Sequence, residues 1–188
     1  RGVGSGFWFN IGGESCATIN INTDGTAILV EGNPDIGGSR ASLAMMAAEV
    51  LGIDYERVRP VVSDTAGLGY NFLTGGSRVT FAGGMAVTQA AEDVVTQLRD
   101  RAAKIWDIPV DAVEWEDGHA KPAGANAGDF EPMSLADIAE TASKTGGPVS
   151  GHAQLNAQGA GPGFGTHICD VEVDKETGRV TVLRYTVV

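Results

Sequence analysis

Cysteine is scarce in this sequence, with two residues in a chain of 188. Two cysteines make neither a disulfide framework nor a cysteine-rich metal cluster, so both classes of protein are excluded. Cys16 and Cys169 lie in strand-like segments, and we expect them to be buried small apolar residues. The histidines, His119, His152 and His167, have no spacing typical of metal ligands. The sequence therefore predicts no metal site built from protein side chains.

Basic residues are also few. Lysine and arginine number 13 against 24 aspartates and glutamates, which gives a formal net charge of −11 at pH 7. Such an acidic chain is not expected to have nucleic acid or an anionic membrane surface as its main partner. No segment approaches the ~20 apolar residues of a membrane span. No signal peptide is recognisable, so we expect a cytoplasmic protein, with the periplasm as the alternative location.

The two ends of the chain are unusual for a complete protein. The chain begins at Arg1 and not at a methionine, and it ends on RVTVLRYTVV, which is typical of a strand. An exposed apolar strand favours aggregation. We therefore expect residues 1–188 to be part of a longer polypeptide.

Alternating apolar and polar residues predict β-hairpins. Residues 16–31 alternate on both sides of an Asp-Gly pair, which is favoured in two-residue turns. Residues 167–187 alternate in the same way around the segment DKETG. Residues 57–62 predict a shorter strand, and Pro60 places it at a sheet edge or at the strand's end. Another short strand is expected at residues 113–116, followed by a polar surface loop.

Three helices are predicted. Residues 41–51 are apolar nearly all round, so we expect this helix to be buried. Residues 85–106 keep a helical period of apolar residues, with charged residues on the other face. Residues 134–144 begin with a variant of the capping box. Hairpins with helices between distant strands predict an α+β fold, a mixed sheet packed against about three helices, and argue against a doubly wound Rossmann sheet.

The word Gly-Gly-Ser-Arg occurs twice, at residues 37–40 and 75–78, each time before a predicted helix. We call these the first and second glycine loops. Backbone N–H groups, a serine hydroxyl and a bidentate arginine guanidinium can all donate hydrogen bonds to a phosphate ester, and a helix N-terminus favours an anion. The alternative is that the glycines end strands and the serine caps a helix. Neither copy is a Walker loop or a dinucleotide fingerprint, and the flanks do not match as in a true repeat.

Other motifs carry less information. Residues 159–166, GAGPGFGT, either let a planar ligand approach the backbone or form an irregular crossover, which we favour. Residues 63–65, SDT, follow a predicted strand and are best explained as a turn. Residues 7–9, FWF, are expected to be core or interface anchors. No nucleophile has an adjacent base, so no hydrolase triad can be built.

The order of these segments resembles the molybdopterin-binding large subunit of the xanthine dehydrogenase and aldehyde oxidase family. The resemblance spans essentially the whole chain, and it is carried by a glycine-rich start and by VEGNPDIGGSRAS, AMMAAEVLGID, RVRPVVSDT, TGGSRVTFAGGMAV and FGTHICDVEVDKETGRV. It implies that residues 1–188 are a partial molybdopterin-binding domain. The remainder of the large subunit, including the segment with the catalytic glutamate, is then expected beyond Val188.

The resemblance also implies a cofactor site. In that family a pterin dithiolene chelates the molybdenum, often as a cytosine dinucleotide in bacteria, which agrees with the lack of a metal-ligand motif. The residues implied to face the molybdopterin are Gly37, Gly38, Ser39, Arg40, Gly75, Gly76, Ser77, Arg78 and Thr80. Family members often have Gly-Gln-Gly where this chain has Ile36-Gly37-Gly38, so the polar contacts of the first glycine loop differ, and Ser39 and Arg40 are candidates to replace the glutamine.

The reaction implied by the resemblance is hydroxylation of an aldehyde or N-heterocycle with oxygen from water. Electrons then leave through iron–sulfur clusters and usually FAD, carried by partner subunits or domains. No residue of this chain is identified as catalytic, so we expect it to be inactive alone. The alternatives are a non-catalytic α+β module that binds a phosphate ester through both glycine loops, and a structural interaction domain whose glycines serve only turns.

Overall fold

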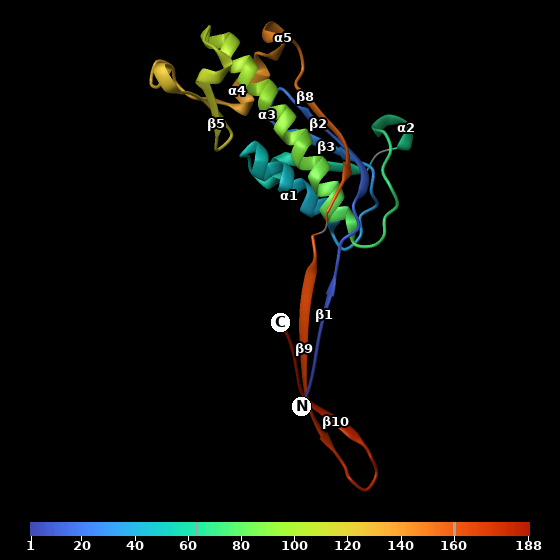
Figure 1. The fold of residues 1–188 in the computed structure, drawn as a ribbon. Coiled ribbons are helices and arrows are strands. Elements are labelled where there is room, and N and C mark those ends of the chain that lie inside the picture. The colour runs from blue at the N-terminus through green and yellow to red at the C-terminus, as the bar shows by residue number, and fades with distance from the viewer. Residues whose placement is uncertain (63, 160) are drawn as a thin grey trace.

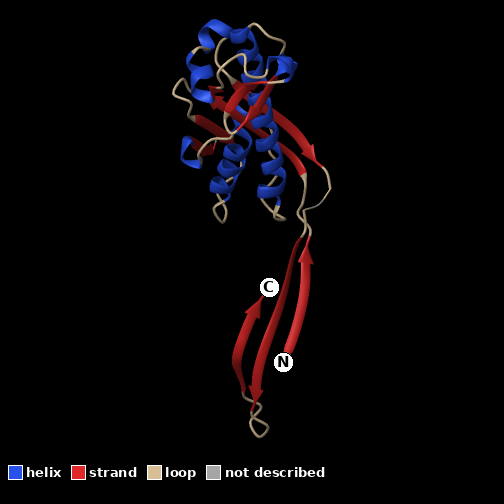
Figure 2. Ribbon diagram, turned by 90° about the vertical axis from the view of Figure 1, so that its left-hand side faces the viewer, coloured by secondary structure: helices blue, strands red, loops and turns tan. Residues whose placement is uncertain are grey.

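The structure is a computed structural model that describes residues 1–62, 64–159 and 161–188. Figure 1 shows a lobe built of helices and short strands, from which a narrow arm of longer strands projects. The arm is a three-stranded sheet in the order β1 (Gly2–Trp8), β9 (Gly163–Val173) and β10 (Val180–Val187). The chain leaves the arm after β1, builds the lobe and returns at β9, so both termini lie on the arm (Figure 2).

A four-stranded sheet in the order β4-β3-β2-β8 forms the main layer of the lobe. The predicted hairpin is confirmed as the antiparallel pair β2 (Gly13–Ile21) and β3 (Ala27–Glu31). On its other side β2 pairs with β8 (Ser150–Ala157), which the sequence did not predict. The predicted edge strand is β4 (Val58–Val62), parallel to β3. Its place at the edge accommodates Pro60, which has no N–H to donate.

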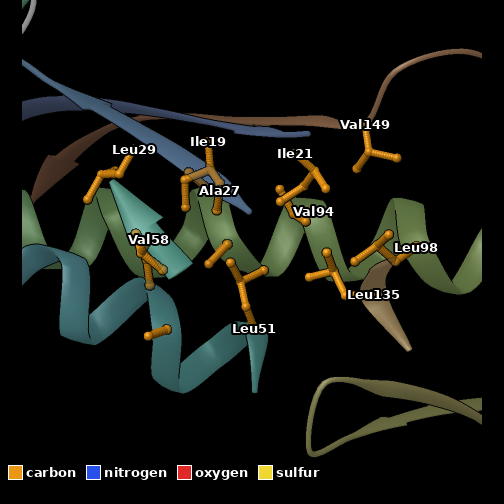
Figure 3. Packing of buried hydrophobic residues seen from close by; sticks show 14 of the residues in the cluster. Ile19, Ile21, Ala27, Leu29, Leu51, Val58, Val94, Leu98, Leu135 and Val149 are labelled. Atoms are coloured by element: carbon orange, nitrogen blue, oxygen red, sulfur yellow. The ribbon is translucent and has the colours of Figure 1, made fainter. Parts of the chain in front are cut away.

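Helices α1 (Ser39–Leu51) and α3 (Gly84–Trp106) pack on this sheet and enclose the core (Figure 3). Ile19 and Leu29 come from the sheet, and Leu51, Val94 and Leu98 come from the helices; all five are 0% exposed. Burying a side chain of this size contributes about 1.5–3 kcal/mol. The packing of a mixed sheet against helices confirms the predicted α+β class.

The prediction that the helix at residues 41–51 is buried holds for one face only. Leu43 and Ala47 face the core at 0% exposure, but Met45 on the opposite side is 60% exposed and Glu49 is exposed as well. Alanine and methionine are tolerated in solvent as well as in a core, so an apolar sequence does not by itself establish burial.

The region after α3 holds more structure than the predicted surface loop. Strands β5 (Val113–Glu116), β6 (His119–Pro122) and β7 (Met133–Ser134) form a small antiparallel sheet. The helix expected at residues 134–144 is divided at Thr141 into α4 (Leu135–Glu140) and α5 (Ala142–Thr145), and its capping box is confirmed. The remaining short helical elements are η1 (Tyr55–Arg57), α2 (Thr65–Leu68), η2 (Val79–Gly83), η3 (Val110–Ala112) and η4 (Gly124–Asn126).

The arm was predicted only in part. Its β9-β10 hairpin is confirmed, whereas β1 was not expected to be a strand. Phe7 and Trp8 are 68% and 51% exposed, so a core role for residues 7–9 is wrong and the interface role stays a prediction. Cys16 is buried as predicted, but Cys169 on β9 is only partly buried.

Candidate functional site

The two glycine loops lie at the same end of the lobe. Helix α1 begins within the first loop and α3 follows the second loop after the turn η2 (Val79–Gly83), and the two helices run side by side in the same general direction (Figure 1). A Cβ atom on Gly84 would lie 2.7 Å from Sδ of Met46. Further along the two helices, Val50 of α1 borders the same hollow as Glu92 of α3. The fold therefore places two loops that are 38 residues apart in sequence at one end of the lobe.

The first glycine loop exposes its two glycines. Gly37 and Gly38 have left-handed φ angles of 63° and 82°, and nothing in the described chain lies within 4 Å of a Cβ placed on either. A ligand can therefore approach this backbone closely. Ser39 is 5% exposed, and its Oγ accepts a hydrogen bond of 3.2 Å from the N–H of Ile36. Ser39 thus closes the turn from inside.

Arg40 of the first loop is held by Asp35. The N–H of Arg40 donates to Oδ1 of Asp35 at 3.1 Å, and its Nη2 donates to Oδ2 at 3.3 Å. These bonds, led by the one from the backbone N–H, lower the pKa of Asp35. A carboxylate of the protein itself therefore occupies the first turn of α1, where the helix dipole favours an anion.

The second glycine loop leaves the N–H groups of Gly76 and Ser77 free of hydrogen bonds within the described chain. Gly76 and Ser77 both have a φ of 60°, which is uncommon for a serine. Within the described chain neither N–H makes a hydrogen bond, and Ser77 is exposed. The carbonyl of Gly76 accepts from the N–H of Ile11 at 3.0 Å and from Nε1 of Trp8 at 3.2 Å. Strained backbone of this kind gathers at ligand-binding sites.

A wide helical turn follows the second loop. Residues 79–83, η2, are wound as a π-helix before α3 continues as an α-helix, and such turns are frequent at functional sites. Thr80 is exposed on this turn and lines a pocket of about 590 Å³ with Asn10, Phe81 and Met85. Thr80 is therefore a predicted site residue that adjoins a cavity.

The connections between the lobe and the arm come to the same place. Residues 159–166 lead from β8 to β9, as the favoured crossover interpretation expects, although Ala160 lies outside the described residues. A Cβ on Gly161 would lie 3.0 Å from the ring of Phe81 and 3.4 Å from Nδ2 of Asn10. The glycine cluster was a visible signal in the sequence, whereas nothing there singled out Asn10.

Arg78 has a different orientation from Arg40. Its guanidinium points into the protein and is 0% exposed. All its hydrogen bonds go to protein acceptors, so the guanidinium does not contact a ligand at the loop surface.

A buried polar group lies beside the first loop. Glu31, at the end of β3, is 2% exposed, and its carboxyl accepts from the N–H of Asn33 at 2.7 Å. Burial raises the pKa of Glu31. Asn33 is also 2% exposed, and its Oδ1 has no hydrogen-bond partner in the described chain. The end of β3 therefore holds one acceptor that a ligand or water can satisfy.

The remaining candidates do not form a site. Asp64 of the SDT segment accepts from the N–H of Ala66 at 2.8 Å at the start of α2, which confirms the turn, while Ser63 lies outside the described residues. Residues 1–62, 64–159 and 161–188 contain no cluster of three potential metal ligands. In the same ranges no helix has both the length and the apolar character that a membrane crossing requires.

Comparison with known proteins identifies the family. The sequence matches the molybdopterin cofactor-binding domain over residues 1–188, so the chain belongs to this family. It is 30% identical over 179 residues to the carbon monoxide dehydrogenase large chain of Hydrogenophaga pseudoflava, which covers 92% of this chain and 22% of that protein. It is 30% identical over 124 residues to the nicotine 6-hydroxylase large subunit of Paenarthrobacter nicotinovorans, 65% of this chain and 15% of that one.

Solved structures share the fold. Quinoline 2-oxidoreductase from Pseudomonas putida 86 aligns with a TM-score of 0.84 at 21% identity, over 99% of this chain and 26% of that chain. Carbon monoxide dehydrogenase from Oligotropha carboxidovorans aligns with a TM-score of 0.83 at 20% identity, over 99% and 25%. The resemblance to molybdenum hydroxylase large subunits is thereby confirmed. The chain spans 22% or less of the two relatives compared by sequence.

Proposed function

We propose that residues 1–188 form part of the cofactor cradle in the large subunit of a molybdenum hydroxylase. The enzyme would hydroxylate an aldehyde or N-heterocycle with oxygen from water. The observation that supports this function is that two glycine loops lie at one end of the lobe in a chain of the molybdopterin-binding family, the first with open space at its glycines and the second with unpaired N–H groups at Gly76 and Ser77. When bound, the cofactor supplies the molybdenum at which oxygen and electrons are transferred.

The residues present fit a pterin carrying phosphate, and we propose the cytosine dinucleotide form. Gly37 and Gly38 offer exposed backbone with no side chain above it, and Gly76 and Ser77 offer unpaired N–H groups. Thr80 adds a hydroxyl at the edge of the neighbouring pocket. N–H groups aimed at phosphate oxygens bind and orient an anion without any basic side chain in contact.

The chain would depend on other parts of the enzyme for turnover. Its described acidic residues include no carboxylate that we assign as a catalytic base, and the glutamate base would come from the rest of the large subunit. Iron–sulfur and FAD-containing subunits or domains would accept the electrons. We therefore propose that residues 1–188 bind and position the cofactor and are inactive alone.

Matched glycine substitutions test the cradle. Gly37 in the first loop and Gly124 in η4 both have left-handed φ angles, 63° and 60°, and open space around a Cβ. Asparagine tolerates this backbone, so Gly37→Asn and Gly124→Asn should strain the chain equally. We expect Gly37→Asn to lower the molybdenum and cytidine nucleotide content of the purified full-length enzyme, and Gly124→Asn to leave both unchanged. A wild-type enzyme without molybdenum would exclude the proposed function. An equal loss of molybdenum and cytidine nucleotide in both variants would show that the first glycine loop does not bind the cofactor.

A further inference from the structure

The guanidinium of Arg78 is the most fully engaged polar group beside the second loop. Arg78 is 0% exposed, and its Cζ lies over the ring of Phe72, 5.7 Å from the ring centroid. The acceptors of its hydrogen bonds are the carbonyls of Gly12 (2.8 Å), Phe72 (3.0 Å), Leu73 (3.3 Å) and Glu14 (2.7 Å), and Oγ of Ser15 (2.6 Å). One side chain therefore ties the second loop to the start of β2 and to residues 72–73.

No carboxylate contacts the guanidinium of Arg78. Within the described chain Arg78 makes no ion pair, and Glu14 accepts a hydrogen bond from it through the backbone carbonyl, while the exposed Glu14 carboxylate acts on it only at longer range. Burial lowers the pKa of Arg78, as expected for a cation away from water. Buried charges are normally paired because an unpaired one is costly. The carbonyl dipoles offset part of this cost, and a positive charge remains beneath the loop.

An anion at the loop surface would complete this arrangement. Ser77 directly precedes Arg78, and within the described chain the N–H groups of Gly76 and Ser77 make no hydrogen bond. A phosphate bound by those N–H groups would lie near the buried charge, where a low dielectric strengthens attraction. Arg40 cannot act in this way, because its exposed guanidinium is already paired with Asp35.

We propose that Arg78 is a positioning residue for the phosphate of the cofactor: its buried guanidinium fixes the second glycine loop and lends it positive potential without touching the ligand. This inference rests on the proposed function. The two identical Gly-Gly-Ser-Arg segments then have different roles. The second supplies positive potential to the cofactor site, whereas the first only lets the ligand approach the backbone closely.

Pyrophosphate binding to the cofactor-free full-length enzyme tests the proposal. We expect Arg78→Gln to weaken binding roughly tenfold or more, the scale of a charge-assisted contact. Arg78→Lys should weaken it less, because it keeps the charge. The binding of pyrophosphate should also depend less on salt in Arg78→Gln than in wild type. The matched control is Arg40→Gln, in the other copy of the word, for which we expect a change below about twofold.

A milder variant serves as a control for misfolding. Ser15→Ala removes one acceptor of the guanidinium and keeps the charge, so it should weaken pyrophosphate binding by about threefold or more even if Arg78→Gln does not fold. Unchanged affinity in Ser15→Ala, or equal losses in the Arg40 and Arg78 variants, would overturn the proposal. If wild-type enzyme holds molybdenum and the Arg78 variants hold as much, only this inference fails. If wild type holds none, the proposed function fails with it.

Discussion

Met46 of α1 and Gly84 of α3 are in close contact between the two helices, because a Cβ on Gly84 would lie 2.7 Å from Sδ of Met46. The contact fixes the distance between the helices that carry the two glycine loops. We expect Gly84→Val to destabilise the fold by about 1–3 kcal/mol through overpacking. The double variant Gly84→Val with Met46→Ala should recover part of this loss, as measured by urea unfolding in a double-mutant cycle. Additive effects of the two substitutions would show that the contact does not set the helix separation.

Gly151 marks a second close approach, between β8 and α3. A Cβ on Gly151 would lie 2.1 Å from the carbonyl oxygen of Ala90, which is backbone and cannot rotate away. Gly151→Ala should therefore lower the melting temperature clearly, with a cost of about 1–3 kcal/mol. Gly163→Ala is the matched control, since Gly163 also lies in a strand but has open space around its Cβ. Similar melting temperatures for the two variants would contradict the packing described.

Burial of Glu31 predicts a pH dependence. Since burial raises the pKa of Glu31 above its ordinary value of 4.5, the folded state binds the proton more tightly than the unfolded state. The associated stability is present below the unfolded pKa and is lost as pH rises toward the folded pKa. Glu31→Gln should flatten the fall in urea midpoint above pH 4.5, because glutamine does not titrate. Glu49→Gln, at an exposed position of α1, should keep the wild-type dependence of the urea midpoint on pH. The same dependence in both variants would show that Glu31 does not cause it.

Asp35 predicts the opposite pH behaviour at the start of α1. Its pKa is lowered, chiefly by the N–H of Arg40, so its contribution is present above the unfolded pKa and is lost as pH falls through the folded pKa. Asp35→Ala should speed hydrogen exchange at the N–H of Arg40, which loses its acceptor. The effect should be confined to the first turn of α1. Exchange rates equal to those of wild type would show that Asp35 does not cap the helix.

The sequence predicted those elements whose pattern is local. The hairpin at residues 16–31 alternates apolar and polar residues, and it forms as expected. Strand β1 escaped prediction because glycine fills its alternate positions, Gly2, Gly4 and Gly6, and leaves no apolar alternation. The π-helical turn of η2 escaped because a single wide turn changes no period that a sequence window can detect.

The candidate site shows the same division between local and long-range information. The sequence located both glycine loops, and the fold brings them to one end of the lobe. It could not tell Arg40 from Arg78, because the same four residues precede both helices. Their directions are decided by distant partners: Asp35 holds Arg40 outside, whereas Gly12 and Ser15 draw Arg78 inside. Such partners become visible only when the chain is folded.

The arm also affects the order in which parts of the chain can fold. Arg1 hydrogen-bonds Asp170 across 169 positions of sequence, and β1 pairs along its whole length with β9. During synthesis the first strand emerges long before its partner, whereas the lobe's hairpin β2-β3 can form at once from neighbouring residues. The glycine loops and α1 would therefore be in place before the arm closes. Because glycine fills every second position of β1 from residue 2 to 6, the waiting strand exposes few side chains that could pair wrongly in the interval.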